Sequence, residues 1–166
     1  MSTPEKIKVL IVAYNASVRF GGEAQLPIKY FQLMQRRGLA VRLVTHERNR
    51  EDLEKEFADF VEYIDFLPET KMDRLVWRLC SVLPKRLKDL LPGLVLETMG
   101  ARSMASIIRR RVRAGEVNVI HQPVPVSPMT PSAVYGFGVP VIIGPMNGGI
   151  RYPEGYQDYE SKRSRH

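Results

Sequence analysis

Short apolar runs alternate with amphipathic stretches along the first part of the chain. The run from Ile7 to Ala13 is continuous and rich in Val and Ile, which is typical of a strand that is covered on both faces in a parallel sheet. A second run of the same character spans residues 39–46. The stretch between the two runs is long enough for a helix, so the sequence predicts a right-handed βαβ unit here.

The stretch between these strands carries the start and stop signals of a helix. We expect the helix to begin near Glu23, with Pro27 in its first turn, where a missing N–H costs little because the first amides have no intrahelical acceptor. Gly38 is expected to end the helix. The residues at helical spacing that should pack on the sheet are Leu26, Tyr30, Leu33 and Met34.

The same alternation continues through the rest of the chain. Three further strands are expected at residues 61–66, 118–121 and 139–144, and further helices at residues 49–60, 73–83, 97–113 and 132–135. The pattern from Trp77 to Leu96 fits either packed helices or an amphipathic segment on a membrane surface, and its Pro and Gly interruptions favour packing. The predicted fold class is therefore α/β: a single Rossmann-like open parallel sheet with helices on both faces.

Length and cysteine usage narrow the class of protein. A chain of 166 residues fits one domain, which we expect to span residues 1–153, followed by a polar, disordered tail at residues 154–166. Cys80 is the only cysteine, which excludes an intrachain disulfide and a thiolate metal cluster and favours a reducing compartment. The sequence shows no signal peptide and no run of about 18 apolar residues. The expected location is therefore cytoplasmic, with peripheral membrane contact as an alternative.

The chain is basic, with a formal net charge of +7, which favours contact with anions. Its densest basic run is IIRRRVRAG, at residues 107–115. This run has no interleaved aromatic residues and no recognisable nucleic-acid-binding motif. We therefore expect no nucleic-acid partner, and a solvated helix end whose arginines are favourable near the C-terminal dipole.

Polar residues follow most of the predicted strands, at the edge where open α/β sheets bind ligands. They are Tyr14 and Asn15, His46 and Glu47, His121 and Gln122, and Met146 and Asn147. His121 ends an apolar strand, where its imidazole could exchange a proton with a substrate near neutral pH or could be a hydrogen-bonded structural histidine. For His46 and the residues after it, the sequence favours a solvated loop. Asn147 and the two glycines after it form a turn that could approach a ligand or simply reverse the chain.

A pair of glycines precedes the first predicted helix. Gly21 and Gly22 belong neither to a Walker-A loop, which needs a Lys and a Ser or Thr, nor to a GxGxxG motif. The amides of residues 22–25 could bind an anion at the helix N-terminus with Glu23 opposing it, or Glu23 could simply favour the helix dipole. Both possibilities fit the spacing. The three histidines are too scattered for a zinc motif, and no metal is expected.

Three stretches together resemble a known family of enzymes. They are KVLIVAYNASVRFGGEAQLPIKYFQLMQRRGLAVRLVTH, NVIHQPVPVSP and GVPVIIGPMNGG, at residues 8–46, 118–128 and 138–149. Across most of residues 7–153 the chain resembles the N-terminal domain of GT-B glycosyltransferases, specifically the retaining enzymes of family 4. The resemblance implies that this domain binds the acceptor, and that the loop of Gly21, Gly22 and Glu23 lies against the diphosphate of a nucleotide sugar.

The resemblance also assigns the other candidate residues. It implies that His121 lies in the interdomain cleft as the candidate catalytic residue, with Pro123 at the position where many relatives have a second histidine. It also implies that Asn147 and Gly148 lie at the rim of this cleft. The strand ends add Asn15, His46, Gln122 and Met146 to the expected acceptor-side rim. Relatives of this kind use a nucleotide sugar as co-substrate and need no metal or other cofactor.

The resemblance further implies that this chain is only one of the two domains that the complete enzyme needs. We expect the donor-binding half, with its glutamate-bearing ExFG-type motif, to be absent from this chain, so that the chain alone is inactive. It would act on a sugar or lipid-linked acceptor together with a nucleotide sugar held by a separate C-terminal domain. Two other functions remain open. One is a non-catalytic binding module that docks on a donor-binding subunit or an anionic membrane surface, and the other is a flavodoxin-like or nucleotide-binding domain that acts alone.

Overall fold

The computed structural model describes residues 6–19, 22–69, 103–126, 132 and 134–146. The predicted helix at residues 73–83, the stretch from Trp77 to Leu96, Cys80 and the tail at residues 154–166 lie outside this part of the chain, as do Gly21, Asn147 and Gly148.

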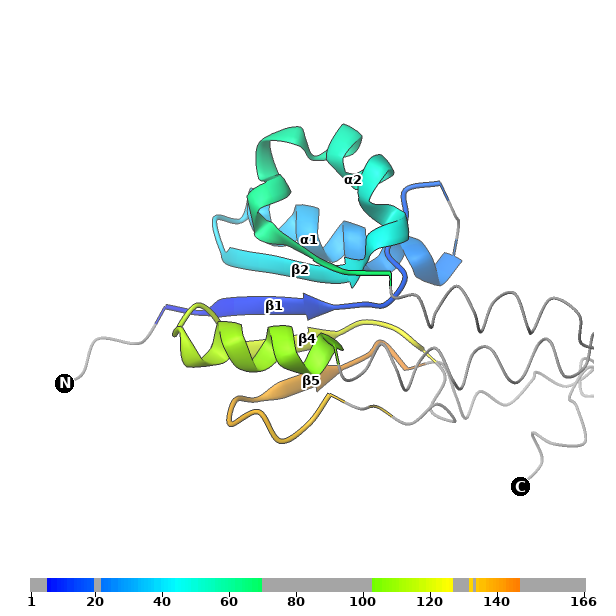
Figure 1. Cartoon of the computed structure of the whole chain (residues 1–166). Coiled ribbons are helices and arrows are strands. Elements are labelled where there is room, and N and C mark those ends of the chain that lie inside the picture. The colour runs from blue at the N-terminus through cyan, green and yellow to red at the C-terminus, as the bar shows by residue number, and fades with distance from the viewer. Residues whose placement is uncertain (1–5, 20–21, 70–102, 127–131, 133, 147–166) are drawn as a thin grey trace, which may run out of the picture.

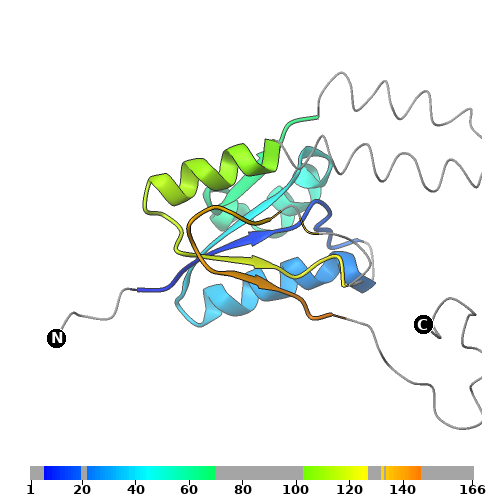
Figure 2. The ribbon, with the colours of Figure 1, turned by 90° about the horizontal axis from the view of Figure 1, so that it is seen from below.

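The described strands form one parallel sheet. They are β1 (Lys8–Val12), β2 (Ala40–His46), β3 (Ile64–Leu67), β4 (Val119–Gln122) and β5 (Val141–Ile143). The order across the sheet is β3-β2-β1-β4-β5, and all neighbouring strands run parallel (Figure 2). The continuous apolar run of β1 therefore lies at the centre of the sheet, where both of its faces are covered. This arrangement confirms the predicted α/β class.

Helices cover both faces of the sheet (Figure 1). The helices α1 (Leu26–Arg36) and α2 (Arg50–Glu56) lie on one face, and a helix at residues 103–113 lies on the other. Successive side chains of a strand point to opposite faces, so β1 contributes to both layers. Val9 and Ile11 belong to the core under α1 and α2, whereas Leu10 and Val12 belong to the core under the helix at residues 103–113.

The helix α1 begins much as predicted, but its buried face differs. A 3₁₀ helix, η1 (Gly22–Gln25), precedes α1, whose first turn contains a proline. Ile28 and Phe31 are buried in the core, with Tyr30 and Met34 packed beside them. Leu33, which was expected to pack on the sheet, is 45% exposed. Two residues of an α-helix span about 200°, so a buried stripe centred on Phe31 leaves Leu33 on the opposite side.

Two predicted elements in the connections are wrong. The helix expected to reach residue 60 ends at Glu56, because buried Phe57 leaves the helical conformation with φ −124° and ψ 43°. A 3₁₀ helix, η3 (Ala58–Tyr63), then delays the start of β3. Near the predicted short helix, residues 132, 134 and 135 are not helical. The Ser132 hydroxyl accepts a hydrogen bond from the Val134 N–H at 3.0 Å, a local contact that competes with helix formation.

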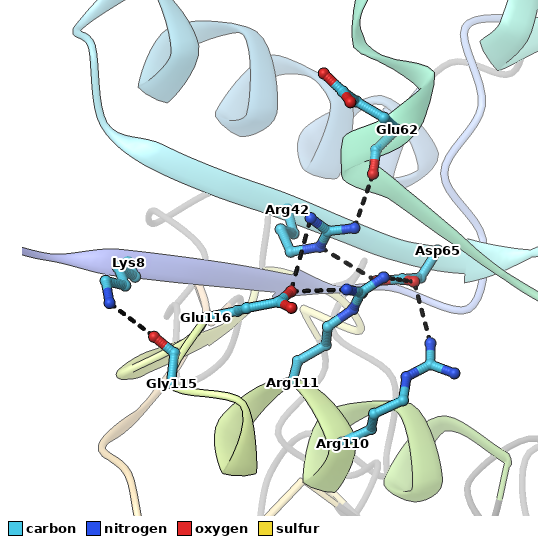
Figure 3. A network of polar contacts seen from close by, with 8 residues as sticks. All are labelled: Lys8, Arg42, Glu62, Asp65, Arg110, Arg111, Gly115 and Glu116. Carbon is cyan, nitrogen blue, oxygen red and sulfur yellow. Dashed lines mark hydrogen bonds and ion pairs between the residues drawn. The ribbon is translucent and has the colours of Figure 1, made fainter.

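Ion pairs fasten the helix at residues 103–113 to the sheet (Figure 3). The carboxylate of Asp65, a buried residue of β3, accepts hydrogen bonds from Arg111 and lies 3.4 Å from both Arg42 and Arg110. Glu116 pairs with Arg111 at 2.7 Å and with Arg42 at 3.8 Å. The hydrogen bond to Asp65 raises the pKa of the Arg111 guanidinium above its ordinary value. The predicted solvated helix end is therefore wrong for Arg111, whose side chain is only 19% exposed because Asp65 holds it against the sheet.

Candidate ligand site at the carboxyl edge of the sheet

The ends of the strands bring the described rim residues to one edge of the sheet, on the side toward which the strand arrows point in Figure 1. The register pairs Ile11 of β1 with His121 of β4. At the neighbouring strand, the backbone N–H of His46 donates to the carbonyl of Tyr14 at 3.2 Å. Two groups of side chains result, one around His121 at the end of β4 and one around Tyr14 and His46 at the ends of β1 and β2.

The imidazole of His121 is held on two sides. The residue is 6% exposed, and its ring packs edge-on against the ring of Tyr30 on α1, with the ring centroids 4.6 Å apart. Its Nε2 atom lies 3.0 Å from the carbonyl oxygen of Gly144, directly after β5. The ring therefore bridges α1, β4 and the segment after β5.

The contact with Gly144 sets the tautomer of the neutral ring. A carbonyl oxygen only accepts hydrogen bonds, so Nε2 of His121 must carry the proton and donate it. In the neutral ring, Nδ1 is then an acceptor. This atom is buried and has no hydrogen-bond partner among the described residues. A buried polar group without a partner costs about 1–3 kcal/mol, so Nδ1 is a group that a ligand hydroxyl could satisfy.

Gln122 lies at the same strand end, but its side chain is already engaged. Its Oε1 atom accepts a hydrogen bond from the Ser132 hydroxyl at 2.5 Å, and that hydroxyl in turn accepts from the Val134 N–H. Because Gln122 follows His121 along the strand, it points to the opposite face, toward the helix at residues 103–113. The contact fixes Ser132 against the end of β4.

His46 is buried at the end of β2 rather than part of a solvated loop. The residue is 5% exposed, and its Nδ1 atom accepts a hydrogen bond from the Arg48 N–H at 3.1 Å. This contact caps the 3₁₀ helix η2 (Glu47–Asn49). The ring also lies 4.9 Å from the ring of Tyr14, and the Arg48 guanidinium lies 5.2 Å from the centroid of the Tyr14 ring. The predicted solvated loop is wrong because β2 continues through His46 and places its ring against Tyr14.

The described part of the glycine loop begins at Gly22, the first residue of η1. Gly22 has φ +66°, a conformation that glycine adopts without steric cost, and the Ser17 N–H donates to the Ala24 carbonyl at 3.0 Å. The Glu23 carboxylate is directed at the Val126 N–H, at 3.5 Å, in the segment that follows β4. Glu23 therefore contacts the segment that follows the strand β4.

Gly144 and Tyr30 complete the surroundings of His121, and the sequence did not single out either of them for this role. Gly144 has φ +116°, and a Cβ atom built there would lie 3.0 Å from the backbone nitrogen of Met146. Glycine is therefore needed at the position whose carbonyl holds the imidazole. Tyr30 was expected only as a core residue of the helix. Its spacing from the glycine loop, one to two turns into the helix, is the signal that could have placed it near the edge.

The other described candidates for the rim are Asn15 and Met146, which are less buried than His46 and His121. Asn15 is half-buried after β1, and Met146 is 50% exposed. Within the part of the chain that the structure describes, no group of three or more His, Cys, Asp or Glu residues is placed to hold a metal ion. None of the described helices is long and apolar enough to cross a membrane.

A groove of about 310 Å³ lies elsewhere on the molecule. Its lining comes from the last turns of α1, from the end of α2 and from η3, and comprises Gln32, Gln35, Arg36, Glu56, Phe57, Ala58, Asp59 and Phe60. Helices that return between parallel strands end near the amino ends of those strands, so this groove lies at the end of the sheet away from His121. It is not part of the candidate site.

Comparison with protein-family models, with curated proteins and with solved structures finds no match to the chain.

Proposed function

We propose that this domain is the acceptor side of a retaining, metal-independent glycosyltransferase that uses a nucleotide sugar. The observation that carries the proposal is the Nδ1 atom of His121, a buried acceptor without a partner among the described residues, at the carboxyl edge of a parallel sheet. A ring nitrogen of this kind can accept a hydrogen bond from a sugar hydroxyl. The doubly covered α/β fold and the three stretches that resemble family 4 glycosyltransferases support the same class.

In this proposal, each residue around His121 has a separate role in binding the substrates. His121 orients a sugar hydroxyl through Nδ1, while Gly144 and Tyr30 hold the ring in place. The backbone amides that follow Gly22 lie in η1, directly before α1, where they favour the negative charge of a diphosphate. Because the Glu23 carboxylate is directed at Val126, it is turned toward the β4 segment and can leave these amides to the anion.

A partner domain supplies the rest of the chemistry. Transfer from a nucleotide sugar requires stabilisation of the charge that develops on the departing diphosphate. The described part of this chain offers amides for that purpose but no Walker-type lysine. We therefore assign the nucleotide sugar to a separate donor-binding domain, and no metal or other cofactor to the described site.

The test combines binding with transfer. The purified chain is titrated with a panel of oligosaccharides and separately incubated with nucleotide sugars and the same oligosaccharides. We expect saturable binding of an oligosaccharide, no transfer by the chain alone, and transfer once a separate donor-binding domain is supplied. A substantial rate of transfer by the chain alone, or no binding of any oligosaccharide, would contradict the proposal.

A second candidate is a non-catalytic module that docks on a donor-binding subunit. Tyr135, Ile142 and Met146 favour it, since these residues around β5 are 75%, 55% and 50% exposed. In that case the two subunits associate, but no oligosaccharide binds at His121. If the module instead docks on an anionic membrane, it sediments with vesicles that contain anionic lipid and not with neutral vesicles.

A further inference from the structure

Arg48 occupies a fixed position at the carboxyl edge, directly after β2. Its backbone N–H is held by Nδ1 of His46 at 3.1 Å, and its guanidinium lies over the ring of Tyr14, 5.2 Å from the ring centroid. The Tyr14 ring is itself supported by the ring of His46, at 4.9 Å. Both ends of the arginine are therefore positioned, although the residue is exposed to solvent. A cation that is held in this way loses less freedom when it binds an anion.

The acidic residues near Arg48 are engaged with other cations. Glu47 pairs with Arg50 at 2.5 Å, Glu51 with Lys55 at 2.6 Å, Asp52 with Arg19 at 2.6 Å and Glu54 with Arg50 at 3.0 Å. No carboxylate of the described residues forms an ion pair with Arg48. The guanidinium of Arg48 therefore has a fixed position at this edge, and no carboxylate in the described part of the chain neutralises its charge.

We infer that Arg48, stacked on Tyr14, is a subsite for a phosphate or carboxylate group of the acceptor. The guanidinium fork matches both anions in geometry and binds them through charge-assisted hydrogen bonds. The strand β1 separates β2 from β4, so the ends that carry Arg48 and His121 are two strand spacings, or about 10 Å, apart. This span suits one or two sugar rings between the anionic group and the hydroxyl held by His121. The assignment to an acceptor rests on the proposed function, whereas the anion subsite itself does not.

The first experiment tests the subsite with the full chain and methyl phosphate. Titration at low ionic strength is followed by the side-chain Nε–Hε signal of Arg48 and the backbone amides of residues 46–49. We expect saturable shifts there, and a dissociation constant that rises about tenfold or more in Arg48→Gln. Arg113→Gln is the matched control, because this arginine is also exposed but belongs to the helix on the other face. Its dissociation constant should stay within about twofold of the unaltered chain.

The outcomes separate this inference from the proposed function. Equal binding by Arg48→Gln and the unaltered chain, or shifts centred away from residues 46–49, would overturn the subsite. Retained binding at Arg48 with no saccharide binding at His121 would keep the subsite and remove the glycosyltransferase proposal.

Parallel titrations with acetate and with vesicles of phosphatidylglycerol identify the source of the anion. Stronger binding to the vesicles than to methyl phosphate, lost in Arg48→Gln, assigns the subsite to a lipid-linked acceptor. Equal or weaker binding to the vesicles assigns it to a soluble one.

Discussion

Two histidines at the same edge of the sheet differ in how their ring nitrogens are used. Both rings are buried, at 5% exposure for His46 and 6% for His121. Nδ1 of His46 accepts the Arg48 N–H and so caps a turn, whereas His121 contacts Gly144 through Nε2 and keeps Nδ1 without a partner among the described residues. Burial alone would give the two residues the same role. The hydrogen-bond inventory makes His121 the better candidate for contact with a ligand.

The substitution His121→Phe separates stability from binding. It keeps the ring that packs on Tyr30, removes one hydrogen bond worth about 1 kcal/mol, and also removes an unpartnered nitrogen that costs about 1–3 kcal/mol. The sum of the two effects predicts a free energy of unfolding, measured with urea, between no change and a gain of about 2 kcal/mol, while saccharide binding is lost. A variant that unfolds much more easily, or that binds saccharide as before, would contradict the role given to Nδ1.

Gly144→Ala tests the backbone that holds this ring. The φ of +116° and the close approach of the Met146 nitrogen both oppose a Cβ atom, so we expect a loss of about 3 kcal/mol in the free energy of unfolding. The matched control is Gly136→Ala, where φ is +73° and no atom lies within 4 Å of the added carbon. There the expected loss is about 1 kcal/mol. Similar losses at the two positions in chemical denaturation would argue against the close contact at Gly144.

At the scale of secondary-structure elements, one carboxylate joins three elements. Asp65 of β3 forms ion pairs with arginines of β2 and of the helix at residues 103–113 (Figure 3). This helix is therefore attached to the sheet by ion pairs as well as by its apolar face. The attachment lies on the face opposite α1 and α2. It stabilises the layer without taking part in the candidate site.

Asp65→Asn removes the charge at the centre of this network. Breaking a buried ion pair leaves its partners uncompensated, so we expect a loss of about 3 kcal/mol in the free energy of unfolding. Glu51→Gln is the control, because its pair with Lys55 is exposed, and it should change stability little. Both values come from urea titrations at neutral pH. An equal effect of the two substitutions would show that the network adds nothing to the fold.

The turn between β2 and α2 should make stability depend on pH. Hydrogen bonds from Arg50 lower the pKa of Glu47 below its ordinary value of 4.5. A carboxyl group whose pKa is lower in the folded state stabilises the fold above its unfolded pKa, and this contribution is lost as the pH falls through the folded pKa. The difference in unfolding free energy between the unaltered chain and Glu47→Gln should therefore be constant above about pH 5 and shrink on further acidification. A difference that grows as the pH falls would have the wrong sign.

The sequence predicts elements better than contacts. Continuous Val- and Ile-rich runs such as Ile7 to Ala13 identify the parallel strands, because a strand covered on both faces has no polar alternation. The buried face of α1 was partly missed, since Leu33 and Phe31 are both apolar and only the packing shows which of them faces the sheet. The sequence also leaves open where polar groups go. Nothing in the spacing tells that Asp65 binds Arg111, or that the carbonyl of Gly144 meets His121, because these residues come from distant parts of the chain.

At the scale of the whole molecule, the candidate residues for ligand binding lie at the carboxyl edge of the sheet, between the two layers of helices. The strands point the same way and the helices cover the two faces (Figures 1 and 2). The groups around His121 and around Tyr14 lie at the carboxyl ends of the strands. The groove at the other end has no comparable unpartnered buried atom among the described residues. The arrangement therefore concentrates the candidate chemistry at one end of the domain, with exposed apolar residues around β5 beside it.

The most direct test of the account is the ring-nitrogen NMR signal of His121 during titration with oligosaccharides. We predict that the neutral form of the ring carries its proton on Nε2, and that an acceptor saccharide shifts the Nδ1 signal saturably as a sugar hydroxyl donates to it. In titrations with uncharged oligosaccharides, which offer no anionic group to Arg48, the Nδ1 signal of His46 serves as the internal control and should not move, because the Arg48 N–H already occupies it. If Nδ1 of His121 stays unchanged while saccharides shift residues elsewhere, or if no saccharide shifts any signal, the assignment of this edge as an acceptor site is contradicted.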